Sequence, residues 1–253
     1  MKGNPNIKFM IEAKQISKSF GNRKVLKNLN LSLQPGEIVA LVGLNGIGKT
    51  TLIRTLCGLY APDSGTIEID GVLFTEETPL IREKLGVVLH ATMLYANLTC
   101  LENLEFYSSL YGINSNDQRI LDLLSMFGLK SRTNDKVRTL SRGLQQRLSI
   151  ARALVHAPQY LLMDEVFSGL DQQSFSEFAS ILRQQSISGS GILFSTHEID
   201  KVFSIATRID IQHNGSIIFS ASVKDMTPQS LLEKYSEVTG GFSFPNQELR
   251  GKL

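Results

Sequence analysis

The sequence predicts an α/β fold with a mixed β-sheet, an antiparallel β subdomain at the N-terminus and a helical subdomain inserted in the middle. Residues 37–42 (EIVALV) and 160–163 (YLLM) are short apolar runs, as expected of strands buried on both faces. Residues 9–20 alternate like a strand with one exposed face. From about residue 98 to residue 156, apolar residues recur at the three-to-four spacing of helices.

Turn and cap residues place the remaining elements. Pro35-Gly36 marks a turn before the strand at 37–42, and a helix is expected over 51–59. Asp70-Gly71 and Asn214-Gly215 each separate two strand-like segments and predict hairpins. Later in the chain we expect a helix at 172–185, a strand at 191–195 and a short helix after His197. The whole is interpreted as one domain over 1–222, with the helical insertion at about 92–158 and a short tail at 223–253.

Composition excludes several classes of protein. The chain of 253 residues is 42% hydrophobic and 20% charged with a net charge of +2, so we expect no nucleic-acid partner. Cys57 and Cys100 form neither a disulfide framework nor a metal spacing, which indicates a reducing, cytoplasmic compartment. No apolar run approaches the roughly 20 residues that cross a bilayer, and the N-terminus lacks a secretory apolar core. If this protein functions at a membrane, it must do so by docking on a separate membrane protein.

The glycine-rich segment GLNGIGKT at 43–50 lies between a predicted strand and a predicted helix. Glycines let the backbone turn its N–H groups toward phosphate oxygens at the positive end of the following helix. The lysine would add a full charge at the β- and γ-phosphates of ATP, and the threonine hydroxyl would bind Mg²⁺. The residues expected to bind the nucleotide here are Gly43, Asn45, Gly46, Gly48, Lys49, Thr50 and Thr51.

Two carboxylates follow the buried strand at 160–163. Asp164 is placed to reach Mg²⁺, and Glu165 is placed to polarise the attacking water as a general base. Together with the P-loop, this pair predicts a P-loop NTPase with a RecA-like core.

The segment LSRGLQQR at 140–147, followed by LSIARALVHAPQYLLMDE, resembles the signature segment of ABC ATPases. The order of the other motifs is similar to that family over roughly residues 9–222. The resemblance implies that Ser141 and the N–H groups at Gly143 contact the γ-phosphate bound to a second ATP-binding subunit. It therefore implies a head-to-tail sandwich of two subunits, here a homodimer, with two shared sites.

The same resemblance assigns further roles. Phe20 stands where the family stacks an aromatic ring on adenine, although a phenylalanine there could equally be core. Residues 168–171 (SGLD) match the loop that communicates across the dimer. His197 matches the switch histidine that contacts the γ-phosphate and helps to orient water.

Three positions depart from the family pattern. His90 replaces the usual Mg²⁺-contacting glutamine, so we expect this imidazole to contact the nucleotide and its metal ion with one hydrogen bond in place of an amide's several. Arg142 and Leu144 replace the usual glycine and glutamine of the signature, and Val166 follows the acidic pair where proline is common. Since Lys49, Asp164, Glu165 and His197 are present, we expect an active ATPase.

The segment LGVVLHATMLYANLTCLENLEFY resembles the ATP-binding subunit of the haem exporter of cytochrome c maturation. It also resembles subunits of multidrug and lipid exporters. The resemblance implies export through an integral membrane permease, with the chain held at the cytoplasmic face of the membrane, and a docking surface around residues 90–110 that includes Met93, Leu94 and Tyr95. The alternatives are a soluble ABC ATPase that serves no transporter and a small-molecule kinase.

Overall fold

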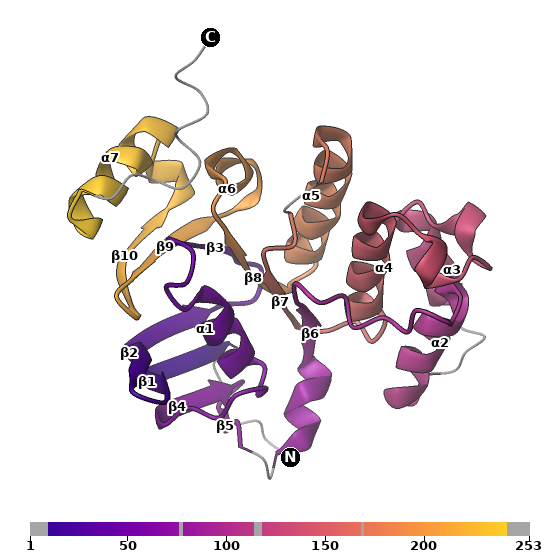
Figure 1. The fold of residues 1–253 in the computed structure, drawn as a ribbon, viewed down its shortest axis with the longest axis horizontal. Coiled ribbons are helices and arrows are strands. Elements are labelled where there is room, and N and C mark those ends of the chain that lie inside the picture. Colours follow the sequence, from indigo (N-terminus) through magenta and orange to yellow (C-terminus); the bar gives the residue numbers. More distant parts are fainter. Residues whose placement is uncertain (1–9, 76–77, 114–117, 168–169, 242–253) are drawn as a thin grey trace, which may run out of the picture.

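The computed structural model describes residues 10–75, 78–113, 118–167 and 170–241. Its centre is a mixed six-stranded sheet with the order β10-β9-β3-β8-β7-β6, in which only the β9–β10 pairing is antiparallel (Figure 1). Its strands are β3 (Ile38–Val42), β6 (Leu85–Val88), β7 (Tyr160–Asp164), β8 (Gly191–Thr196), β9 (Arg208–His213) and β10 (Ser216–Ser222). Every residue of β3, β7 and β8 is buried, which explains their continuous apolar runs.

A second, antiparallel sheet has the order β2-β1-β4-β5 and lies beside α1 in Figure 1. Its strands are β1 (Ile11–Phe20), β2 (Arg23–Leu33), β4 (Ser64–Ile69) and β5 (Val72–Leu73). Both predicted hairpins are confirmed, because Asp70-Gly71 joins β4 to β5 and Asn214-Gly215 joins β9 to β10. The mixed sheet and the N-terminal antiparallel sheet are as the sequence predicts.

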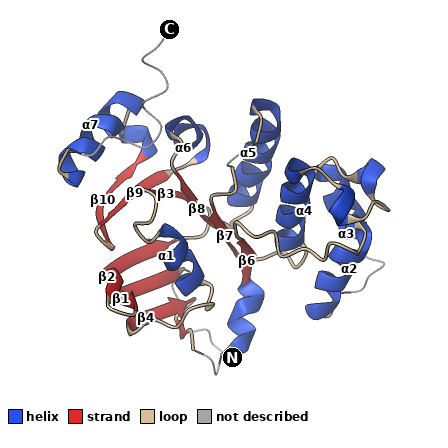
Figure 2. Cartoon of the chain, viewed as in Figure 1, coloured by secondary structure: helices blue, strands red, loops and turns tan. Residues whose placement is uncertain are grey.

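The inserted helices lie on the side of β6, where α4 packs against that strand (Figure 2). They are α2 (Cys100–Leu110), α3 (Gln118–Met126) and α4 (Arg142–Leu154). Short 3-10 turns lie at Pro79–Lys84, Lys130–Arg132 and Val137–Thr139. Thr99 and Glu102 form a capping box that begins α2, and Ser141 caps α4 by accepting the N–H of Leu144 at 3.4 Å.

Two hydrophobic clusters use opposite faces of the central sheet. Along β3, Ile38, Ala40 and Val42 face one cluster, whereas Val39 and Leu41 face the other, as the two-residue period of a strand requires. The second cluster holds α1 (Lys49–Leu56) between the central and antiparallel sheets. The first cluster collects the inserted helices together with α5 (Gln172–Ile187), α6 (Ile199–Ile205) and α7 (Pro228–Thr239).

The residues after 222 contribute to this packing. They form a 3-10 turn at Val223–Asp225 and then α7, which a capping box at Thr227 begins. Leu231 and Tyr235 of α7 are fully buried in the first cluster. Burying a side chain such as Leu231 contributes roughly 1.5–3 kcal/mol, so α7 belongs to the core of the domain.

Helix α1 differs from its predicted limits of 51–59. It begins at Lys49, directly after Gly48, and ends at Leu56. The helix stops there because Gly58 adopts a left-handed φ of 75°, the conformation that commonly terminates a helix. No helix in the described part of the chain has the length and apolar character needed to span a membrane.

Candidate nucleotide-binding site

The loop from Gly43 to Gly48 connects the buried strand β3 to α1 and shapes the site. Gly46 and Gly48 adopt left-handed φ values of 76° and 115°. A Cβ atom on Gly48 would lie 2.9 Å from a methyl of Val25, so this position requires glycine. No side chain caps the start of α1. The first N–H groups of the helix therefore remain available to an anionic ligand.

A cavity of about 420 Å³ opens in front of this loop. Most of the predicted P-loop residues line it, together with Glu165 from the end of β7, His197 from the end of β8, and His90 after β6. Its lining residues are Arg23, Val25, Asn45, Gly46, Gly48, Lys49, Thr50, Thr51, His90, Glu165 and His197. The structure thus brings together residues from five separate parts of the chain.

Lys49 is the charged centre of the P-loop and is only 5% exposed. Its ammonium donates to the carbonyl oxygens of Gly43 at 2.8 Å and Leu44 at 3.1 Å, and it lies 3.6 Å from Glu165 Oε1. Burial lowers the pKa of Lys49 from its ordinary value, and the negative charges of Glu165 and Asp164 oppose that shift. The loop carbonyls and Glu165 therefore hold the cation where a phosphate group would meet it.

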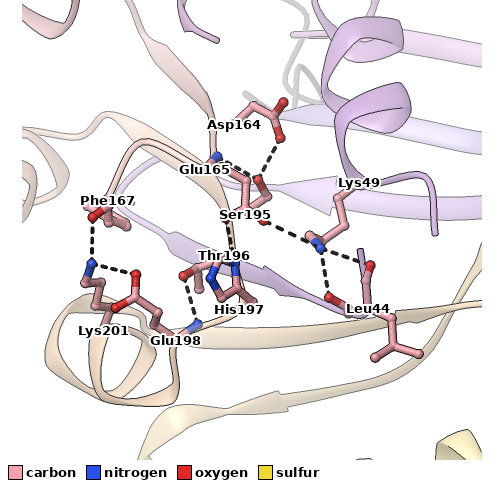
Figure 3. A network of polar contacts seen from close by, with 11 residues as sticks. Leu44, Lys49, Asp164, Glu165, Phe167, Ser195, Thr196, His197, Glu198 and Lys201 are labelled. Atoms are coloured by element: carbon pink, nitrogen blue, oxygen red, sulfur yellow. Dashed lines mark hydrogen bonds and ion pairs between the residues drawn. The ribbon is translucent and has the colours of Figure 1, made fainter. Parts of the chain in front are cut away.

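Glu165 and His197 contact each other at the carboxyl ends of the neighbouring strands β7 and β8 (Figure 3). His197 Nδ1 lies 2.9 Å from Glu165 Oε2, and each side chain is about one fifth exposed. Glu165 adopts a left-handed φ of 53°, which is unusual for a residue with a Cβ and turns the chain sharply at the end of β7. The carboxylate is thereby held between Lys49 and His197.

Ser195 connects the two acidic residues, as Figure 3 shows. Its hydroxyl donates to Asp164 Oδ1 at 2.8 Å and accepts the backbone N–H of Glu165 at 2.9 Å. Ser195 is fully buried and is the register partner of Asp164 in the parallel β7–β8 pair. Ser195 was not among the site residues predicted from the sequence. Its signal is a serine at the carboxyl end of an otherwise apolar strand, two residues before His197.

Replacing Ser195 with alanine should lower both stability and turnover. The change leaves the N–H of Glu165 without its acceptor, and an unsatisfied buried polar group costs about 1–3 kcal/mol. Urea denaturation should show this loss in the free energy of unfolding, and phosphate release should show a lower kcat. Ser216→Ala is the matched control, since this hydroxyl donates to the backbone of Lys27 at the protein surface. Equal unfolding free energies for the two variants would contradict the bridging role of Ser195.

Several expected site residues lie outside the wall of the cavity in this single chain. Gly43 does not line the cavity, but its carbonyl accepts a hydrogen bond from Lys49. Asp164 is buried and accepts a hydrogen bond from the hydroxyl of Ser195. Phe20 is 45% exposed and packs edge-on against Tyr60, with ring centroids 5.3 Å apart. Ser141 and Gly143 occupy the start of α4 and do not line the cavity. Residues 168 and 169 of the SGLD loop lie outside the described residues.

Arg23 and Val25 also line the cavity and were not predicted from the sequence. The guanidinium of Arg23 donates to the carbonyl of Gly46 at 2.9 Å and adds a second cation beside the P-loop. Both residues belong to β2, whose pairing with β1 brings them over the loop. Their position depends on tertiary packing, and no local pattern indicates it.

This site defines an ATPase of the P-loop class. A buried lysine ends a glycine-rich loop at a helix start, and a glutamate–histidine pair faces it from the carboxyl ends of two adjacent strands. A family model described as ABC transporter matches residues 26–168. The chain therefore belongs to the ATP-binding subunits of ABC transporters. It binds and hydrolyses ATP as these subunits do.

Individual relatives support this assignment. The chain is 31% identical over 249 residues to the ABC transporter ATP-binding protein NatA of Bacillus subtilis (strain 168), covering 96% of this chain and 99% of that protein. It is 34% identical over 219 residues to the linearmycin resistance ATP-binding protein LnrL of the same organism, covering 86% of this chain and 70% of that protein. A solved structure of an ATP-binding subunit of an ABC transporter superposes with a TM-score of 0.82 at 30% identity, covering 91% of this chain and 99% of that one.

Proposed function

We propose that this subunit hydrolyses ATP at a site shared between two copies of the chain and thereby drives export through a separate membrane permease. The observation that carries the proposal is the convergence of Lys49, Glu165 and His197 on one cavity. Lys49 would bind the β- and γ-phosphates, and Glu165 would accept the proton of the attacking water. His197, 2.9 Å from Glu165, would orient that carboxylate and the γ-phosphate.

The residues present fit a nucleotide-bound Mg²⁺ ion. Thr50 lines the cavity and offers a hydroxyl. The carboxylate of Asp164 is buried, does not line the cavity, and accepts the hydroxyl of Ser195. The described residues contain no cluster of three or more His, Cys, Asp or Glu side chains that could hold a metal. Mg²⁺ sites in nucleotide-binding proteins commonly use one carboxylate, substrate phosphates and water. When bound, the ion would neutralise charge that develops on the phosphates.

The placement of Ser141 and Gly143 supports a head-to-tail dimer. Both lie at the start of α4, in the helical part of the molecule, and are exposed or half-buried outside their own chain's cavity. A second copy facing this one would offer that helix start to the γ-phosphate. ATP hydrolysis that needs no acceptor and rises more than linearly with protein concentration would support this arrangement, and it would exclude the kinase alternative. A strictly linear rate would argue against the shared site.

His90 lines the cavity and is exposed, as expected of a residue that contacts the nucleotide or its metal. An amide at this position can make the one hydrogen bond that a neutral imidazole makes. We expect His90→Gln to retain ATPase activity within about threefold of the parent, a difference below about 0.7 kcal/mol in barrier height. The kcat of the two proteins checks this. Loss of activity in the variant would show that the imidazole performs chemistry of its own.

A second groove, of about 390 Å³, lies between the central sheet and the inserted helices and is the proposed permease site. Tyr111 and His156 stack in its wall with ring centroids 3.8 Å apart, and burial lowers the pKa of His156 to about 4, so this ring is neutral near pH 7. Arg152 is 7% exposed and also lines the groove. No described carboxylate forms an ion pair with it. Its guanidinium donates to the carbonyl of Val87 and lies 5.0 Å from the ring centroid of Tyr107. The rest of the lining is mostly apolar, so the groove suits a largely apolar permease segment.

Only part of the predicted docking segment lines this groove. Met93 lines it and is 44% exposed. Tyr95 is 49% exposed and does not line the groove, but it packs against Phe106 and against Tyr107, which does line it. Leu94 packs against the core.

Introducing a charged side chain into the apolar groove tests the docking site. Leu110 lines the groove and is 64% exposed, so Leu110→Arg should fold and hydrolyse ATP normally. We expect it to lose co-purification with a co-expressed candidate permease solubilised in mild detergent. Ile187→Arg is the control, because Ile187 is 86% exposed at the end of α5 and lies outside the groove. Equal permease recovery with both variants would place the docking surface elsewhere.

The transported substrate is proposed from the relatives. LnrL is named for resistance to linearmycin, which supports the multidrug or lipid exporter alternative for this chain. The haem-exporter resemblance of residues 85–107 finds no support in the relatives described above. We therefore propose export of a drug-like or lipid-like compound, with the subunit held at the inner face of the membrane by its permease. Co-sedimentation with ribosomes in place of a membrane protein would favour the soluble alternative.

A further inference from the structure

Lys201 is a buried cation that the ATPase mechanism described above does not use. It lies in the first turn of α6 and is only 9% exposed. Its ammonium lies 5.4 Å from the ring centroid of Phe175 and 6.0 Å from that of Phe167. A buried lysine in an aromatic setting is costly unless its hydrogen bonds are specific. The contacts that satisfy this lysine therefore indicate what it does.

Two hydrogen bonds satisfy the ammonium, and they reach two different segments (Figure 3). One goes to the backbone carbonyl of Phe167 at 2.6 Å, and the other to Glu198 Oε1 at 2.6 Å. Phe167 lies two residues after Glu165, and Glu198 directly follows His197. Lys201 thus ties the segment that carries the general base to the segment that carries the switch histidine.

Neighbouring contacts hold both acceptors of the Lys201 ammonium in place. The Phe167 ring packs edge-on against Phe175 and Phe194, with centroids 5.4 Å and 5.1 Å away, and is therefore fixed between α5 and β8. The backbone N–H of Glu198 donates to Thr196 Oγ1 at 3.1 Å, which fixes the turn after β8. Displacement of the ammonium would release the Phe167 carbonyl and the Glu198 carboxylate together.

We propose that Lys201 is a positioning residue for ATP hydrolysis, which holds His197 within hydrogen-bonding distance of Glu165. The inference rests on the proposed roles of Glu165 and His197. On one side of that pair, Ser195 binds Asp164 and the N–H of Glu165. On the other side, Lys201 binds the chain after each partner. Together these two ties set the spacing between the strand ends at the site.

The test is Lys201→Met, which keeps the apolar stem but removes the charge and both hydrogen bonds. We expect kcat to fall at least about tenfold, equivalent to 1.4 kcal/mol in barrier height, while KM for ATP stays within twofold because the P-loop is untouched. Lys234→Met is the matched control. Lys234 pairs with Glu237 at 2.9 Å on α7, also three residues apart, and lies over the ring of Phe219 at 5.6 Å. Its kcat should equal that of the parent.

A spectroscopic readout separates positioning from general support of the fold. The chain has four histidines, so ¹⁵N-histidine spectra can be assigned with a His197→Gln variant. In Lys201→Met the Nδ1 resonance of His197 should shift, whereas Lys234→Met should leave it unchanged. This measurement needs no ATP hydrolysis, so it tests the inference even if the proposed mechanism fails.

The outcomes are distinct. A parent protein whose ATPase rate does not depend on Glu165 would overturn the proposed mechanism. An active parent with unchanged kcat and an unchanged His197 resonance in Lys201→Met would overturn the positioning role. A lower melting temperature with normal kcat per folded molecule would reduce Lys201 to a structural residue and also overturn the inference. Glu198→Gln, which retains an acceptor for Lys201, should lose less activity than Lys201→Met.

Discussion

Glu165→Gln should lower kcat by about 10²–10⁴-fold, the range that general acid–base catalysis contributes, while ATP binding is retained. The amide cannot accept a proton from water, but it preserves the side-chain volume and can still meet His197 and Lys49. Because hydrolysis would then stall after ATP is bound, two copies should remain associated. Phosphate release measures the rate, and light scattering with and without ATP measures the association.

Glu177→Gln is the control for this change. Glu177 lies on the surface of α5 with its side chain 48% exposed, and it pairs with Arg147 at 3.1 Å away from the cavity. Its neutralisation should leave kcat unchanged. Undiminished turnover in Glu165→Gln would remove Glu165 as the general base and direct attention to another water-activating group.

Lys49→Met should weaken ATP binding at least about thirtyfold, because removing one partner of a buried charge pair costs about 2 kcal/mol or more. The empty protein should keep most of its stability, although the carbonyls of Gly43 and Leu44 and the carboxylate of Glu165 lose a partner. Burial already opposes the charged form of Lys49, as its lowered pKa shows, and methionine fills the same volume without that penalty. Equilibrium binding of a fluorescent ATP analogue and urea denaturation measure the two effects separately.

Lys130→Met is the matched control, since Lys130 is exposed in a 3-10 turn of the helical part. It should bind the analogue as the parent does. If Lys49→Met also retained affinity within threefold, the ammonium would not be a phosphate ligand. The carbonyl contacts to Gly43 and Leu44 would then be its main role.

The parts of the site that depend on local backbone were predictable from the sequence. The P-loop requires glycines at left-handed positions beside a helix start, and these leave a contiguous pattern ending at Lys49 and Thr50. Asp164 and Glu165 were predictable because a buried strand ends there. His197 was found by resemblance to the family, at the end of the next strand in the sheet.

The supporting residues could not be predicted in the same way. Ser195 acts through its register with Asp164, and Arg23 reaches the cavity through pairing of β2 with β1. Lys201 has a role only because α6 returns its side chain to the carbonyl of Phe167, 34 positions earlier. Each depends on contacts between distant segments, for which one sequence carries no local signal. The packing of α7 against the core is another such case, because its buried residues meet partners far earlier in the chain.

The alternation of β3 between two hydrophobic clusters has a consequence for cooperativity. Neighbouring residues such as Val39 and Ala40 belong to different clusters, yet they share one backbone and one set of sheet hydrogen bonds. Loss of either cluster would expose one face of the sheet and loosen its strands, on which the other cluster also packs. Partial unfolding on one side therefore cannot leave the other intact, and the nucleotide loop and the helices behind the sheet should melt in a single transition.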